Sequence, residues 1–233
     1  MSILAIEVSG LGKQFRLHTQ GGVAIEVFRD LDFQVRFGEC VALHGPSGCG
    51  KSTLLRALYA NYKVGEGTIR VRHQENWVDM AQAEPRAVLA VRRHSMGYVS
   101  QFLRVIPRVP ALEIVAEPLR LRGIEAEEAR VRAGDMLARL NVPERLWGLA
   151  PATFSGGEQQ RVNIARGFIA EMPILLLDEP TAALDAANRA IVAELILERK
   201  AAGTAIVGIF HDAEIRTQVC DRIFEIEPFK AAA

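Results

Sequence analysis

The sequence lacks an excess of charge of either sign. Its 233 residues include 28 basic and 28 acidic side chains, for a formal net charge of zero. A balanced chain argues against nucleic acid or an anionic membrane surface as the main partner. Only three cysteines are present, Cys40, Cys49 and Cys220, and their spacing matches no metal site. An odd, small number of cysteines is typical of a reducing compartment, so the sequence predicts a cytoplasmic protein without structural disulfides.

Long apolar segments are also missing. The longest runs, such as residues 174–177, are far too short to span a bilayer. The first residues show no basic stretch followed by an apolar one, so we expect no signal peptide. The length suits one α/β domain, with room for a subdomain, that needs no disulfides to be stable.

A glycine-rich segment with the spacing G-x-x-x-x-G-K-S lies between an expected strand at 40–44 and an expected helix from residue 53. This is the setting of a phosphate-binding loop, in which backbone N–H groups and a helix N-terminus surround the phosphates of a nucleotide. Lys51 is expected to contact the β- and γ-phosphates, and Ser52 to bind Mg²⁺. We assign to the nucleotide site Gly45, Pro46, Ser47, Gly48, Cys49, Gly50, Lys51, Ser52 and Thr53.

Two adjacent carboxylates, Asp178 and Glu179, follow the apolar run 174–177. Such a run predicts a buried central strand of a parallel sheet. At its end, Asp178 is expected to hold Mg²⁺ and Glu179 to act as the general base for the attacking water.

A second segment of small residues, Ser155-Gly156-Gly157-Glu158, starts an expected helix and can present N–H groups to an anion. The alternative is an ordinary serine N-cap. Because the chain already has one phosphate-binding loop, a second anion site suggests a nucleotide held by another subunit. The sequence therefore predicts a head-to-tail dimer, with each segment facing the other subunit's γ-phosphate.

Four further positions are candidates for the same site. Gln101 follows an expected strand at 97–100 and is assigned to Mg²⁺ or the water, and His211 follows an expected strand at 205–209 and is assigned to the γ-phosphate. Asp185 is expected at the dimer interface and as the N-cap of a helix at 186–200. Phe15 is expected to stack on adenine, with packing inside a β layer as its alternative.

The order of these elements predicts an α/β fold. We expect a nucleotide-binding core with an N-terminal antiparallel β layer, formed by residues 1–101 and 166–233, and an inserted helical subdomain at 102–165. A hairpin is expected over residues 66–80, and a helix at 125–140 with Ala133, Leu137 and Leu140 on one face.

Together these motifs resemble the ATP-binding-cassette ATPases over nearly the whole chain. The resemblance equates 45–52 with Walker A, Gln101 with the Q-loop and 155–159 with the signature. It equates 175–178 with Walker B, 183–185 with the D-loop and His211 with the switch histidine. It implies a P-loop NTPase fold, with Mg²⁺ and two ATP molecules sandwiched between two such domains.

Segments outside these motifs are similar to the L subunit of the bacterial carbon–phosphorus lyase system. They are residues 58–62, 100–107, 141–147 and 154–168. This resemblance implies an ATPase subunit for phosphonate breakdown, linked to formation of ribose 1-methylphosphonate 5-triphosphate from ATP and methylphosphonate. The implied partners are the lyase core subunits, docked partly through Phe102 to Leu112, and a homodimer or a dimer with a second ATPase, the K subunit.

Two alternatives to this function stay open. One is the ATP-binding subunit of a membrane transporter, of the lipoprotein-release, macrolide-exporter or phosphonate type, in which contact with the membrane is indirect. Residues 110–115 depart from the pattern typical of the exporters, which weakens this alternative. The other is a cassette protein that binds ATP with slow turnover, against which the intact Glu179 and His211 argue.

Overall fold

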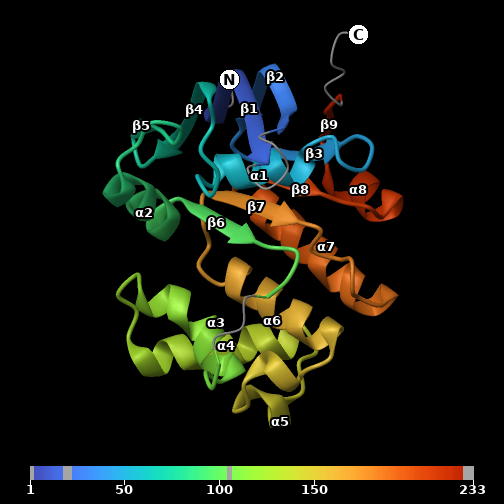
Figure 1. Cartoon of the computed structure of the whole chain (residues 1–233). Coiled ribbons are helices and arrows are strands. Elements are labelled where there is room, and N and C mark those ends of the chain that lie inside the picture. Colours follow the sequence, from blue (N-terminus) through green and yellow to red (C-terminus); the bar gives the residue numbers. More distant parts are fainter. Residues whose placement is uncertain (1–2, 18–22, 104–106, 228–233) are drawn as a thin grey trace.

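An antiparallel sheet forms the upper layer of the molecule (Figure 1). The computed structural model describes residues 3–17, 23–103 and 107–227. The strand order is β2-β1-β4-β5, and the strands span Leu4–Leu17 (β1), Val23–Arg36 (β2), Glu66–His73 (β4) and Asn76–Asp79 (β5). The expected hairpin is confirmed as β4–β5. The pairing of β1 with β2 contains register shifts and continues to the last residue of β1.

A parallel sheet lies at the centre of the α/β core. Its strands are β3 (Cys40–His44), β6 (Met96–Val99), β7 (Ile174–Asp178), β8 (Ala205–Ile209) and β9 (Arg222–Glu225), in the order β6-β7-β8-β3-β9. Every neighbouring pair is parallel. All residues of β7 and β8 are buried, as their uninterrupted apolar sequences predict for central strands.

Helices cover both faces of the parallel sheet. Helix α1 (Lys51–Leu58) packs between the two sheets and buries Leu54, Leu55 and Leu58 there. Helices α7 (Ala186–Ala201) and α8 (Ala213–Val219) pack together beside β8 (Figure 1). Helix α2 (Pro85–His94) leads into β6. The α/β fold class predicted from the sequence is confirmed.

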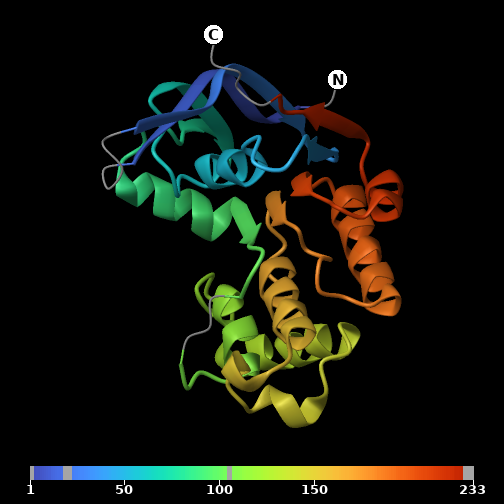
Figure 2. The same ribbon diagram turned by 45° about the vertical axis from the view of Figure 1, so that its right-hand side comes forward.

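A helical lobe lies below the core in the view of Figure 2. Two connections join it to the core, one after β6 and one before β7. It contains α3 (Ala111–Arg120), α4 (Ala126–Arg139), α5 (Glu144–Trp147), a 3₁₀ turn at Pro151–Thr153, and α6 (Gly156–Phe168). The expected face of α4 is present, with Ala133 and Leu137 buried beside Leu140. Helix α6 reaches the core, where Asn163 Nδ2 donates to the Ser100 carbonyl at 2.6 Å.

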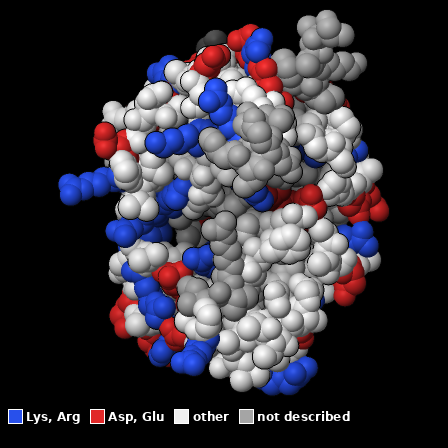
Figure 3. All heavy atoms as spheres, in the orientation of Figure 1, with Lys and Arg blue, Asp and Glu red and all other residues white. Residues whose placement is uncertain are grey.

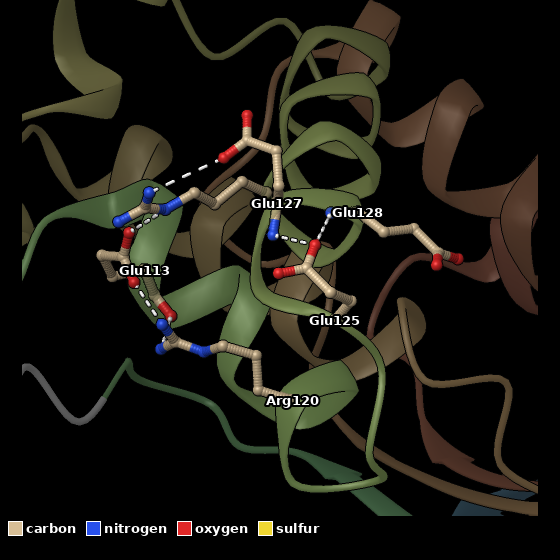
Figure 4. Close-up of polar contacts among 6 residues, drawn as sticks. Glu113, Arg120, Glu125, Glu127 and Glu128 are labelled. Carbon is tan, nitrogen blue, oxygen red and sulfur yellow. Dashed lines mark hydrogen bonds and ion pairs between the residues drawn. The ribbon is translucent and has the colours of Figure 1, made fainter.

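Charged side chains link the first two helices of the lobe (Figure 4). Glu113 of α3 accepts from Arg120 at 2.5 Å and from Arg130 of α4 at 2.7 Å. Glu125 caps α4 by accepting from the backbone N–H groups of Glu127 and Glu128. Of these contacts, the pair between Glu113 and Arg130 joins α3 to α4 at the surface.

The surface drawn in Figure 3 carries both signs of charge, interspersed over the lobe and the core. None of the helices in the described part of the chain combines the length and the apolar character needed to cross a bilayer.

Candidate functional site

The glycine-rich loop at 45–50 connects the end of β3 to the start of α1. Gly45 and Gly50 both have a positive φ, of 143° and 103°. A Cβ at Gly50 would lie 2.5 Å from Cγ1 of Val27, and one at Gly45 would lie 2.5 Å from the Ile226 carbonyl oxygen. Only glycine satisfies both the conformation and the space at these two positions.

The loop ends in a helix start that offers free donors. Gly50 is the N-cap of α1, and no side chain caps the helix there. The first-turn N–H groups are therefore available to an anion, and the helix dipole favours negative charge at this point. Lys51 lies at the same place, and its Nζ donates to the carbonyls of Gly45 at 2.8 Å and Pro46 at 3.0 Å. The loop thus holds one cation and several N–H groups.

Asp178 lies at the end of β7, directly beside α1. Its Oδ1 accepts from the Ser52 hydroxyl at 3.1 Å and its Oδ2 from the Tyr98 hydroxyl at 3.0 Å. The residue is 1% exposed. Burial raises the pKa of Asp178, and the hydrogen bonds from Tyr98 and Ser52 oppose that shift. Burial and the neighbouring Asp178 also raise the pKa of Tyr98, so its hydroxyl stays a donor.

Glu179 brings two more sequence candidates to the same edge of the sheet. Its Oε2 accepts from Gln101 Nε2 at 3.1 Å, and its Oε1 lies 2.8 Å from His211 Nε2. Residue 179 has a φ of 53°, unusual for a non-glycine residue, and its N–H donates to the Ile209 carbonyl at 3.2 Å. The chain thus turns sharply after Asp178, so that the two adjacent carboxylates have different surroundings.

Several of these groups line a common pocket of about 290 Å³. It is formed by the glycine-rich loop, the start of α1, Val27, Glu179 and His211. A cation, a set of backbone donors and a polarised carboxylate therefore face one space. Among the described residues, no group of three or more His, Cys, Asp or Glu side chains forms a metal site by itself. Ser52 and Asp178 supply the hard oxygen ligands that suit Mg²⁺, which usually takes its remaining ligands from phosphates and water.

The segment 155–158 lies apart from this pocket, at the start of α6 in the helical lobe (Figure 1). Ser155 and Glu158 form a capping box: the Ser155 hydroxyl accepts from the Glu158 N–H, and the Glu158 carboxylate accepts from the Ser155 N–H at 2.8 Å. A Cβ on Gly157 would lie 3.1 Å from the Ala183 carbonyl oxygen. The first turn of α6 therefore packs against the segment 183–185, and Asp185 caps α7 through the Asn188 N–H at 2.8 Å.

Phe15 lies on β1, in the antiparallel sheet. Its ring meets that of Tyr62 edge to face, with centroids 5.3 Å apart, and Lys13 Nζ lies 4.4 Å from its centroid. The residue is partly exposed. The structure therefore places Phe15 in an aromatic and cationic cluster on the β layer.

Two polar residues at the site have no motif in the sequence. Tyr98 points from β6 to Asp178, and its ring stacks on Tyr59 with centroids 5.1 Å apart. Gln160 of α6 is buried and donates to the Pro180 carbonyl at 3.0 Å, close to Glu179. An alternating strand pattern can place Tyr98 on a face of the sheet, but it cannot indicate which strand lies beside it.

Comparisons with known proteins agree with this geometry. The family model described as ABC transporter matches residues 28–182. A lipoprotein-releasing system ATP-binding protein from Idiomarina loihiensis is 36% identical over 87% of this chain and 87% of its own length. A macrolide export ATP-binding/permease protein from Rhodopseudomonas palustris is 34% identical over 95% of this chain. This chain spans 32% of that protein, and 61% of an uncharacterised ABC transporter ATP-binding protein from Mycobacterium tuberculosis that is 36% identical.

Solved structures show the same fold. The ATP-binding cassette MJ0796, in a dimeric post-hydrolysis state bound to ADP and Pi, superposes with a TM-score of 0.86 at 30% identity. The match covers 95% of this chain and 94% of that one. The ABC transporter family model covers more than half of the chain and matches the loop, the buried strand and the carboxylates described above. This chain therefore belongs to the ABC transporter family and has the fold of its ATP-binding cassettes.

Proposed function

We propose that the chain is the ATP-binding and ATP-hydrolysing subunit of a membrane transporter. The observation that carries the ATPase part is the convergence of Lys51, Asp178, Glu179, Gln101 and His211 at one edge of the parallel sheet. Three different strands deliver these groups to the glycine-rich loop. The similarity to relatives named for lipoprotein release and macrolide export supports the transporter part.

The roles follow from the position of each group. The loop N–H groups and Lys51 bind the phosphates of ATP, after Lys51 exchanges its loop carbonyls for phosphate oxygens. Ser52 and Asp178 would hold Mg²⁺, which would neutralise phosphate charge. Tyr98 keeps the Asp178 carboxylate oriented by donating to it.

Hydrolysis requires a base beside the γ-phosphate. Glu179 is placed to take a proton from the attacking water, because it lines the pocket and two neighbours orient its carboxylate. His211 and Gln101 orient that carboxylate, and His211 also lines the pocket in which the γ-phosphate would lie. Phe15 would contribute an aromatic surface for adenine on the β layer.

A head-to-tail dimer is the proposed working form. The signature segment at 155–158 lies beside the segment 183–185, because a Cβ on Gly157 would lie 3.1 Å from the Ala183 carbonyl oxygen. The phosphate-binding loop lies on the core, away from that segment (Figure 1). A second copy turned by half a revolution would bring each signature segment to the other copy's nucleotide. The dimeric MJ0796 cassette, with the same fold, supports this arrangement.

The carbon–phosphorus lyase function expected from the sequence shares every ATP-handling residue with the transporter function. It differs in the partner that docks on the cassette. The comparisons favour the transporter, because the relatives described above are named as transporter components and none of these names refers to phosphonate breakdown. We therefore propose a membrane subunit in place of the lyase core as the docked partner.

An exposed apolar residue indicates where that partner would bind. Phe102 is 75% exposed and directly follows Gln101, whose amide contacts Glu179. A partner that covers Phe102 would thus lie next to the residue that contacts the Glu179 carboxylate. Arg108, in the same expected docking segment, is exposed, and Arg104 lies outside the described residues.

The test identifies what the chain binds in its own cells. The tagged full-length protein is isolated in mild detergent, and its partners are identified by mass spectrometry. The expected partner is a multi-span membrane protein, with recovery reduced in F102D. I3D is the matched control, because Ile3 is 62% exposed on the β layer, away from the lobe. Recovery of soluble phosphonate-degrading enzymes in place of a membrane protein would overturn the transporter assignment and support the lyase function.

A further inference from the structure

An ion pair outside the proposed catalytic groups joins two helices next to His211. Arg189 of α7 donates through a terminal nitrogen to Oδ2 of Asp212 at 2.5 Å. Both side chains are partly exposed, at 36% and 24%. A pair this exposed contributes little to stability. We therefore consider its effect on the position of Asp212.

The two carboxylate oxygens of Asp212 contact two different helices. Oδ1 accepts from the N–H groups of Glu214 at 2.9 Å and Ile215 at 3.2 Å, and so caps α8. Oδ2 takes the contact with Arg189. The backbone hydrogen bond from Ile215 and the bond from Arg189 both lower the pKa of Asp212, so the carboxylate stays charged. The residue after His211 is thereby fixed from α7 and from α8.

The imidazole of His211 depends on this fixed neighbour. Its side chain is 61% exposed, so packing does not hold it in place. Its Nε2 nevertheless lies 2.8 Å from Glu179 Oε1. His211, Asp212, Arg189 and Glu179 also line a second pocket of about 380 Å³. A change in the backbone at 211–212 would therefore shift the contact with the catalytic carboxylate directly.

Arg189 also lies one helical turn from the segment 183–185. Its backbone N–H donates to the Asp185 carbonyl at 2.9 Å, and Asp185 caps the same helix. Ala183 in turn approaches Gly157 of the signature segment. A continuous set of contacts thus runs from the proposed dimer face, through the first turns of α7, to Asp212 and His211.

We propose that Arg189 is a positioning residue that couples the segment 183–185 to His211, and through His211 to Glu179. The coupling rests on the proposed ATPase function and dimer. Arg189 does not touch the pocket that holds the phosphates; it acts by holding Asp212. When a partner subunit presses on 183–185, the first turn of α7 carries that movement to the carboxylate that fixes the backbone beside His211.

The experiment compares purified wild type, R189A, R189K and R139A. Arg139 makes an ion pair of similar exposure with Glu198 at the other end of α7, so R139A is the matched control. We expect R189A to lower kcat about tenfold or more, with KM for ATP and the melting temperature close to those of R139A, since small misplacement of catalytic groups costs this much. R189K should recover most of the rate, because the contact uses a single terminal nitrogen.

A double-mutant cycle with H211A separates positioning from general damage. If Arg189 acts through His211, R189A should cause no further loss of kcat in the H211A background. An equal loss in both backgrounds, or wild-type kcat in R189A, would overturn the proposal. The absolute rate of the wild type tests the ATPase function separately. Amide exchange at Glu214 and Ile215 without nucleotide provides a readout independent of turnover: it should rise in R189A and not in R139A, and unchanged exchange would also overturn the coupling.

Discussion

Replacing Glu179 by glutamine removes the proposed general base and keeps the shape of the side chain. A glutamine at this position can still offer its oxygen to His211, which lies 2.8 Å from Oε1 of the glutamate. Its amide nitrogen then faces Gln101, which donates to Oε2 in the wild type. Because the Gln101 amide can turn over and present its oxygen, both contacts can survive. Residue 179 has a backbone φ of 53°, and glutamate and glutamine adopt this conformation at similar cost.

The expected effects on stability and on rate therefore differ widely. The free energy of unfolding should change by less than about 0.5 kcal/mol, as it does for substitutions that disrupt no core packing, buried hydrogen bond or backbone conformation. Loss of a general base lowers the rate by about 10²–10⁴-fold, which corresponds to about 2.7–5.5 kcal/mol in the activation barrier. The loss of rate cannot then be attributed to a damaged fold.

The assay measures phosphate release at saturating Mg-ATP, together with melting temperature and size-exclusion profile with and without ATP. E179Q should bind ATP, shown by a rise in melting temperature, and accumulate as an ATP-bound dimer. E225Q is the control, because Glu225 lies 3.0 Å from His44 in a second His–Glu pair, outside the pocket. Turnover in E179Q as fast as in E225Q would refute the assignment of Glu179 as the base.

Two further predictions concern the dimer and the buried carboxylate. K51A and S155R should each be inactive alone, and S155R should also lose about 1 kcal/mol of helix capping. When the two variants are mixed, part of the activity should return, because their heterodimer has one intact composite site. No recovery despite proven mixing would contradict the head-to-tail arrangement. Burial raises the pKa of Asp178, so the folded state keeps this proton to a higher pH than the unfolded chain, and the ionised carboxylate costs stability at neutral pH. Without nucleotide, D178N should therefore melt above the wild type at neutral pH, and the difference should shrink as the pH falls; a difference that grows on acidification would contradict this reasoning.

Local sequence was enough to predict the elements that depend on neighbouring residues. The spacing of Gly45, Gly50 and Lys51 requires one loop conformation between a strand and a helix, and that conformation is present. The apolar runs at 174–177 and 205–209 form fully buried strands, because such runs leave no face for water. Asp185 caps its helix as expected, and Ser155 forms the N-cap that was the alternative to anion binding, since a cap contacts N–H groups two or three residues away.

Elements stabilised by distant partners were not predicted from the sequence. We assigned no strand to residues 23–36, where Phe28 and Phe33 are both buried although they lie five positions apart, an offset that places side chains on opposite faces of a regular strand. A bulge at Asp30, with a φ of 48°, changes which side chains face the core and so breaks the alternation. Helix α2, in which only Val91 is buried, and the short strand β9 were missed for a related reason: each has a weak apolar pattern.

The candidate ATP-site residues could thus be predicted from the sequence by itself, because the glycine-rich loop and the strand ending in Asp178 and Glu179 are each formed by consecutive residues. What those residues contact was decided by the tertiary structure. The strand order β6-β7-β8-β3 brings Gln101, Asp178 and His211 to one edge of the sheet. The hydrogen bond from Tyr98 to Asp178 and the ion pair from Arg189 to Asp212 join residues 80 and 23 positions apart, with no motif to mark them. Such contacts depend on which strands and helices pack side by side, and that choice is made by the burial of the whole core and not by any local segment.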